Sequence, residues 1–519
     1  GALYANAVFH PGVAPMFWWL LPMMSSAGEL PLLYRVDVPD YPGALTTSTR
    51  GSLLDHPPED LPWRHESLAE VDEEIVPQGE TQAWEALDAM GVRAWHEAGY
   101  DGSGVKIAVF DVQWYGAELD GAELGDFETH DCFIHRSCEQ PIDTLRPTFA
   151  FETGSHGVAC AEVIRDIAPG AELHLVRVSG LTTLESAVDW AIREEIDLIS
   201  MSLSFFNESF YDGTGSVNAL IPPLAAAGAL MVTSAGNYAD QHFSGTFSDE
   251  DTDGYHDFDG SSELRVYLFP GRSTIYLLWD QFRDCGRSDL DLFVVDSAGD
   301  VVGWGANEQS VSADSCFPGE RLSAFAETEG WYGIRIRKSG GAGDTRFDVH
   351  VRRGELEVYT GGSITDPGTS PLALTVGAIR ATEYASAGVE PFSSLGPTSS
   401  GLAKPDIAGP DGLSSTVYGP TGFFGTSAST PAVAGALALI MSREPDIDSY
   451  AAARRLQSWA RAPQGAATWS APDPGEGAGR ARLPDPAHLE GGCAGGRQAM
   501  AGLALPLWVV GVRRRRRRR

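Results

Sequence analysis

The sequence predicts an α/β fold with a doubly wound parallel sheet, interrupted by an antiparallel β-sandwich. In residues 82–240 and 361–490, apolar runs of strand length alternate with helical stretches, which is typical of a parallel sheet with helices on both faces. In residues 241–360, apolar and polar residues alternate, which indicates antiparallel strands. We therefore expect one α/β domain, made of two separated segments, around an inserted sandwich.

The length of the chain bears on its number of domains, and its net charge bears on its partners. At 519 residues, with 43% hydrophobic residues, the chain can bury a large core and is long enough for two or more domains. The formal net charge is -34. Nucleic acid is not expected as a partner, because phosphate binding needs lysines and arginines clustered on one face.

The first segment contains the predicted strands in order. Apolar residues three and four apart predict a helix over 82–99, and the β-rich run 105–110 ends at Asp111. The carboxyl edge of such a sheet is where α/β proteins bind ligands. The stretch with Cys132 and Cys138 is expected to be a loop. Further strands are predicted over 172–178, 197–203, 229–234 and, in the second segment, 372–379.

The inserted region carries acidic side chains as well as alternating apolar ones. The loop 249–254 has the sequence Asp-Glu-Asp-Thr-Asp-Gly, and Asp289 and Asp291 form a second acidic pair. Their oxygen atoms are suitable calcium ligands, but the loop lacks the glutamate at position twelve of an EF-hand. We expect that the protein requires no cofactor. Calcium binding by these acidic residues is left open.

Four residues in separate motifs are the parts of an acyl-transfer site. Asp111 ends a strand, His156 begins a helix in a glycine-rich stretch, Asn237 follows a small-residue strand, and Ser427 opens the apolar helical run after Gly425. A serine hydroxyl needs an imidazole to accept its proton, a carboxylate to orient that imidazole and an amide to stabilise the oxyanion. Taken alone, the serine would fit an ordinary helix N-cap equally well.

These motifs resemble those of the subtilisin-like serine peptidases. The matching stretches are 105–111, 154–161, 235–237 and 425–431, with Met201-Ser202-Leu203 and Lys404-Pro405-Asp406-Ile407 as further matches. The resemblance implies Ser427 as nucleophile, His156 as general acid and base, Asp111 as orienting carboxylate and Asn237 as oxyanion donor, with no metal. It also implies that the substrate cleft is lined by Ser202, Leu203 and Ser204.

The sequence departs from the family pattern beside these residues. Val112 and Gln113 follow Asp111, Val158 follows His156-Gly157, and Ser204 replaces a common glycine. These departures bear on substrate preference more than on the chemistry. The leading hypothesis is an endopeptidase that cleaves polypeptide substrates through an acyl-enzyme. The alternatives are an inactive peptidase-like binding protein and an ester hydrolase, the latter disfavoured because Ser427 lacks the Gly-x-Ser-x-Gly elbow.

The two ends of the chain and its cysteines indicate where the protein is located. Residues 1–81 are interpreted as a signal or pro region. Residues 491–519 contain Cys493, an apolar run and seven arginines from Arg513, and resemble a bacterial C-terminal sorting tag that engages the membrane or sorting machinery. A secreted or cell-envelope protein is expected. In an oxidising compartment Cys132 could pair with Cys138, and Cys285 with Cys316, whereas Cys160 is expected to be buried.

Overall fold

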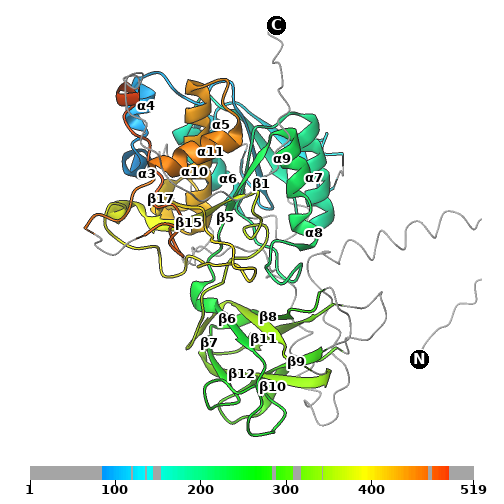
Figure 1. Cartoon of the computed structure of the whole chain (residues 1–519). Helices are drawn as coiled ribbons and strands as arrows, with labels where there is room; N and C mark the ends of the chain where they lie inside the picture. Colours follow the sequence, from blue (N-terminus) through cyan, green and yellow to red (C-terminus); the bar gives the residue numbers. More distant parts are fainter. Residues whose placement is uncertain are drawn as a thin grey trace, which may run out of the picture.

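The computed structural model describes residues 84–117, 121–134, 137–143, 154–282, 288–307, 317–341, 343–465 and 470–489. They form an α/β body, at the top of Figure 1, and a body of antiparallel strands below it. The predicted fold class is confirmed. The expected signal or pro region and the sorting tag lie outside the described residues, as do Cys285, Cys316 and Cys493.

The α/β body is built on a seven-stranded sheet with the order β16-β15-β5-β4-β1-β3-β2. All neighbouring strands in this sheet run parallel. Two of its strands, β15 and β16, follow the antiparallel body in the sequence, whereas the other five precede it. The strands are β1 (Lys106–Asp111), β2 (Phe127–Asp131), β3 (Glu172–Arg177), β4 (Leu198–Met201), β5 (Leu230–Ser234), β15 (Leu374–Arg380) and β16 (Ile407–Asp411).

Helices cover both faces of this sheet. Alternate residues of β1 belong to two different cores, with Ile107 and Val109 in one and Ala108 and Phe110 in the other. The first core contains residues of α6 (His156–Ile167), α10 (Thr426–Arg443) and α11 (Ser449–Trp459), and the second contains residues of α7 (Leu181–Arg193), α8 (Gly215–Asn218) and α9 (Ile221–Ala227). Successive side chains of a strand point to opposite faces of the sheet, so both faces of β1 are covered by helices, as expected for a doubly wound sheet.

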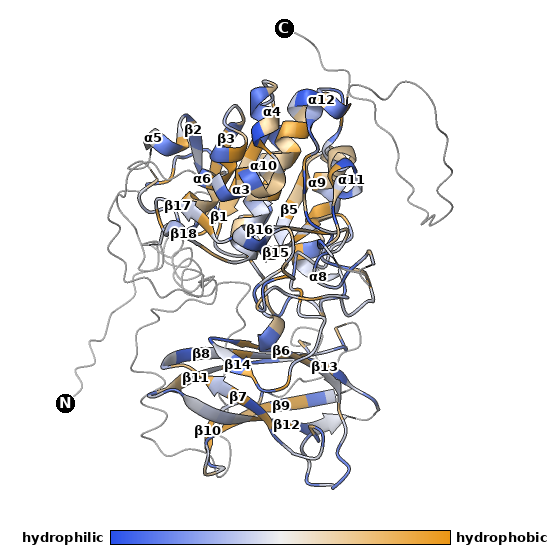
Figure 2. Ribbon diagram, turned by 90° about the vertical axis from the view of Figure 1, so that its left-hand side faces the viewer, coloured by the Kyte–Doolittle hydropathy of each residue, from blue (hydrophilic) through white to orange (hydrophobic). Residues whose placement is uncertain are grey.

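Helix α10 lies at the centre of the α/β body. Its residues 426–441 are all buried, and Figure 2 shows the helix among the hydrophobic strands. Small side chains allow close packing, since a Cβ on Gly435 would lie 2.8 Å from Cβ of Ile167 in α6. Among the described helices, none is both long and apolar enough to cross a membrane.

Two predictions for the first segment were wrong. The single helix expected over 82–99 is two helices, α3 (Trp84–Met90) and α4 (Arg93–Glu97), because Gly91 adopts φ +79° and turns the chain against the Leu483 carbonyl. The first apolar residue of that helical pattern, Trp84, is 51% exposed. The stretch expected to be only a loop before Cys132 contains the edge strand β2.

The antiparallel body consists of two sheets that share one hydrophobic core. One sheet has the order β10-β9-β12-β7-β14 and the other β11-β8-β13-β6, and both contribute to this core. The strands are β6 (His242–Thr246), β7 (Leu264–Leu268), β8 (Gly271–Trp279), β9 (Ser288–Val295), β10 (Val301–Gly305), β11 (Gly319–Ala326), β12 (Gly330–Gly341), β13 (Arg346–Arg352) and β14 (Gly354–Leu356).

Aromatic side chains join the two bodies. Phe206, which follows β4, stacks on Tyr276 of β8 with ring centroids 4.7 Å apart and an interplanar angle of 7°. His350 of β13 meets the edge of the same phenylalanine ring at 5.4 Å. All three side chains are buried, so the contact is an apolar interface and not a solvated hinge.

Candidate active site

Asp111 and His156 form a buried hydrogen-bonded pair at the carboxyl edge of the sheet. Nδ1 of His156 lies 2.7 Å from Oδ2 of Asp111. The other carboxylate oxygen accepts hydrogen bonds from the N–H groups of Val112, at 2.7 Å, and Gln113, at 3.1 Å. Because a carboxylate only accepts, Nδ1 of the histidine carries the hydrogen, and Nε2 of the neutral ring is the nitrogen that can take up a proton.

Glycine at position 157 allows this pair to form. A Cβ on Gly157 would lie 2.8 Å from Cβ of Asp111 and 2.9 Å from the Trp114 ring. The N–H of Gly157 also donates to the Gln113 carbonyl at 3.0 Å. Any larger residue would therefore push the start of α6, with His156, away from the end of β1.

Helix α6 also contacts the backbone of Ser427. Cys160, one turn after His156, donates from Sγ to the Ser427 carbonyl at 3.6 Å, and Ser202 donates from Oγ to the same carbonyl at 3.2 Å. The same helix thus brings the Asp111–His156 pair and the start of α10 to one place. Burial, with a smaller effect of Asp111, raises the pKa of the Cys160 thiol well above its usual value, so the thiol stays neutral.

Asn237 is tied to the residue before Ser427. Its Oδ1 accepts from both the N–H and the hydroxyl of Thr426, at 3.0 and 2.9 Å. The Thr426 hydroxyl also accepts from the N–H of Gly236 at 3.2 Å. These bonds engage the carbonyl side of the Asn237 amide, so the NH₂ group is the side available to an oxyanion.

The turn before α10 is held by a second carboxylate. Oδ2 of Asp411, at the end of β16, accepts from the N–H of Gly425 at 3.1 Å. Burial raises the pKa of Asp411 to about 7. Gly425 has φ +107°, a conformation that favours glycine, and a Cβ there would lie 2.9 Å from Nδ2 of Asn237.

The structure pairs Asp111 with His156 and links Asn237 to the residue before Ser427, and the catalytic roles of these four residues stay predictions. The contacts of Thr426, Cys160 and Asp411 were missed. Thr426 and Cys160 stand inside the matched stretches 425–431 and 154–161, but these contacts join distant segments of the chain. Ser202 is buried and contacts the Ser427 backbone, Leu203 is packed in the core on the α7 side, and Ser204 is half-buried. Their expected place along the substrate cleft stays a prediction.

The remaining predictions concern metals and cysteines. Asp249, Asp251 and Asp257 have carboxylate oxygens within 4.8 Å of one another, and calcium binding there stays a prediction. Asp291 instead pairs with Arg337 and Ser339, and burial raises its pKa to about 6. Cys132 and Cys138 form the predicted disulfide, and Cys160 is buried as expected.

The chain matches one family model in two stretches, 148–263 and 341–475. The match is to the subtilase family. The matched stretches include His156, Asn237 and Ser427, whereas Asp111 precedes them and is assigned by its bond to His156. The gap between the stretches falls in the antiparallel body. This match supports a serine protease function.

Several solved protease structures are similar to this chain, and the one with a TM-score above 0.5 supports the fold. The CspB protease of Clostridium perfringens is 18% identical with a TM-score of 0.54, and the alignment covers 78% of this chain and 99% of that protein. The MycP3 protease from the type VII (ESX-3) secretion system is 18% identical with a TM-score of 0.42, covering 78% and 87%. The prenylagaramide maturation protease PagA is 13% identical with a TM-score of 0.40, covering 76% and 96%.

Proposed function

We propose that this protein is a serine endopeptidase that hydrolyses peptide bonds through an acyl-enzyme. The observation that carries the proposal is the 2.7 Å bond between Asp111 and His156, on a helix that also contacts the Ser427 backbone. An isolated helix cap would need neither a buried histidine nor a buried carboxylate. Burial of these two polar groups is costly, and a buried carboxylate paired with a histidine is a common feature of functional sites.

The chemistry follows from the role of each group. Ser427 Oγ bonds to the substrate carbonyl carbon while its proton passes to Nε2 of His156, and Asp111 stabilises the imidazolium. Asn237 Nδ2 and the backbone N–H of Ser427, in the first turn of α10, donate to the developing oxyanion. His156 then protonates the departing amine as the C–N bond breaks. Water attacks the acyl-enzyme with the same proton transfers and releases Ser427.

Casein hydrolysis by the purified full-length protein tests this proposal. We expect hydrolysis by the wild type and its loss in Ser427→Ala, with the unfolding midpoint of the variant retained. Retained hydrolysis in the variant would contradict the assignment of Ser427. A folded wild type that binds polypeptides without cleaving them would favour the peptidase-like binding protein. Hydrolysis of simple esters alone would favour an ester hydrolase.

We further propose that the protein acts outside the cytoplasm. The disulfide between Cys132 and Cys138 supports an oxidising compartment, and the sequence of residues 491–519 has the pattern of a sorting tag. Fractionation of cells that express the full chain should place it in the envelope or medium. Deletion of 491–519 should shift it from the envelope to the medium, and an unchanged cytoplasmic location for both would contradict the proposal.

A further inference from the structure

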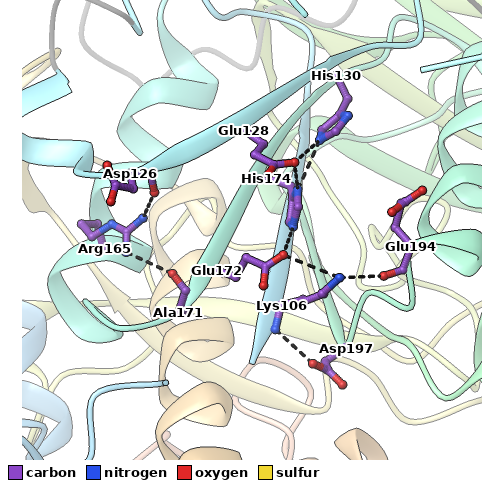
Figure 3. A network of polar contacts seen from close by, with 10 residues as sticks. All are labelled: Lys106, Asp126, Glu128, His130, Arg165, Ala171, Glu172, His174, Glu194 and Asp197. Atoms are coloured by element: carbon purple, nitrogen blue, oxygen red, sulfur yellow. Dashed lines mark hydrogen bonds and ion pairs between the residues drawn. The ribbon is translucent and has the colours of Figure 1, made fainter. Parts of the chain in front are cut away.

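Three metal-ligating side chains gather on one face of the β2 and β3 edge, away from the candidate active site residues. Glu128 and His130 lie two residues apart on β2, and His174 of β3 is the register partner of Glu128. All three point to the α7 side of the sheet, where Figure 3 shows them turned toward one another. Side chains two residues apart on a strand point to the same face of the sheet, and so does the side chain of the paired residue on the neighbouring strand. Glu128, His130 and His174 therefore share one face.

The three ligand atoms form a triangle of the right size for a tetrahedral ion. Nε2 of His130 lies 3.2 Å from Nδ1 of His174. Oε2 of Glu128 lies 3.8 Å from the first nitrogen and 3.7 Å from the second. Ligands at the usual Zn–N and Zn–O distances of about 2.1 Å would lie about 3.4 Å apart in a tetrahedron. Small side-chain adjustments would therefore complete three of the four positions.

The outer nitrogen of each ring already has an acceptor. Nδ1 of His130 lies 3.1 Å from the Cys138 carbonyl, and Nε2 of His174 lies 3.1 Å from Oε1 of Glu172. A carbonyl and a carboxylate only accept, so both outer nitrogens carry hydrogen. In the neutral rings, the two facing nitrogens then both present lone pairs across 3.2 Å. A proton on one ring or a metal ion between the two nitrogens removes this repulsion.

The surroundings also fit a metal site. The Trp190 ring of α7 packs on His130 at 4.3 Å and on His174 at 5.6 Å, and so fixes both imidazoles. Glu172 is in turn 3.6 Å from Nζ of Lys106 (Figure 3). Hydrogen-bonded carboxylates and carbonyls behind ligating histidines are the usual outer shell of protein metal sites. The Glu128 side chain is 69% exposed, which leaves the site open to solvent.

We propose that Glu128, His130 and His174 bind a zinc-type divalent transition-metal ion, with water in the fourth position. Two imidazoles and one carboxylate suit zinc, whereas calcium and magnesium prefer oxygen ligands alone. The ion would join the edge strand β2 to β3 just before the Cys132–Cys138 disulfide. The site would be separate from the catalytic groups of the proposed function.

Equilibrium dialysis of the untagged full-length protein against zinc, after removal of metals with a chelator, tests the site. We expect one zinc ion bound per chain in the wild type and its loss in His174→Ala. Glu172→Gln, which leaves the three ligands in place but weakens the outer hydrogen bond to His174 and removes the ion pair with Lys106, should lower zinc affinity about 10- to 100-fold. Cobalt in place of zinc should give the strong visible absorption of a tetrahedral site, and His174→Ala should lose it.

Three further variants make the outcome decisive. Glu128→Gln changes an exposed side chain, so it should weaken zinc binding without loss of fold. His488→Ala, at an exposed histidine of α12 (Pro486–Leu489), should bind zinc as the wild type does. His156→Ala should also retain the ion. Absence of zinc from the wild type, unchanged binding in both His174→Ala and Glu128→Gln, or loss confined to His156→Ala would each overturn the proposal.

Discussion

Thr426 donates both its N–H and its hydroxyl to Oδ1 of Asn237, at 3.0 and 2.9 Å. The proposed nucleophile and oxyanion donor are therefore linked by one neighbouring side chain. The residue pair joins the end of β5 to the start of α10, across the whole antiparallel body in sequence. This link sets the orientation of the Asn237 amide, on which the proposed stabilisation of the oxyanion depends.

Thr426→Val should lower kcat while KM changes little. Valine keeps the shape and the backbone N–H but removes the hydroxyl bonds to Asn237 and Gly236. Loss of such a bond costs roughly 0.5 to 1.5 kcal/mol, which corresponds to about a 2- to 10-fold fall in kcat if it is expressed in the transition state. Steady-state kinetics on a peptide substrate measure this effect. Thr426→Ser should stay within about twofold of the wild type, and a larger fall in Ser than in Val would contradict the account.

Asp111→Asn should lower kcat about 10⁴-fold with the fold intact. The asparagine carbonyl would keep accepting from Val112 and Gln113, and its NH₂ would then face Nδ1 of His156. The imidazole would be forced into the tautomer with hydrogen on Nε2, which cannot accept the serine proton. Single-turnover kinetics with an activated ester give the rate, and thermal unfolding gives the control. A loss below tenfold in a folded variant would argue against this pair as catalytic.

Glu208→Gln should flatten the pH dependence of stability. Burial raises the pKa of Glu208 to about 8, from an ordinary value of 4.5. Between these values the folded state binds one more proton than the unfolded state, so the free energy of unfolding falls as pH rises, by about 1.4 kcal/mol per pH unit from this group. Glutamine removes that contribution. Urea unfolding at several pH values from 5 to 8 checks it, and equal slopes in both proteins would refute the expectation.

Phe206→Ala should destabilise the protein by about 3 to 5 kcal/mol, because it removes a buried ring stacked on Tyr276 between the two bodies. Denaturant unfolding measures the loss. Tyr359→Ala removes an aromatic ring that is 54% exposed and should change stability by less than about 0.5 kcal/mol. Equal effects of the two substitutions would show that the aromatic interface contributes little.

Much of the α/β body could be predicted from sequence because its strands are buried on both faces. Residues 107–110 of β1 and 230–232 of β5 are apolar, and the polar side chains Asp111 and Asn237 come after these runs, where the ligand-binding edge is expected. Strand β2 was missed because it lies at the sheet edge, is half-exposed and reads Phe-Glu-Thr-His-Asp. A run with so many polar residues is also typical of a loop. The residues of the proposed zinc-type site were therefore not placed together by the sequence.

The supports of the candidate site could not be predicted from local patterns. Thr426 and Asn237 are 189 positions apart, and Cys160 and Ser427 are 267 apart. Periodicity describes how a segment packs, whereas these contacts depend on which segments the finished sheet brings together. The break between α3 and α4 also depends on a contact between distant segments. Gly91 turns the chain against the carbonyl of Leu483, which lies near the end of the described sequence.

The central claim is that Ser427 is a nucleophile activated by His156 and Asp111. Mass spectrometry after treatment with a fluorophosphonate tests it most directly, because this reagent modifies activated serines. We expect one adduct per chain on the Ser427 peptide of the wild type, none in Ser427→Ala, and a strongly reduced rate in His156→Ala. Absence of an adduct on Ser427 in the folded wild type, or an equal labelling rate in His156→Ala, would contradict the claim.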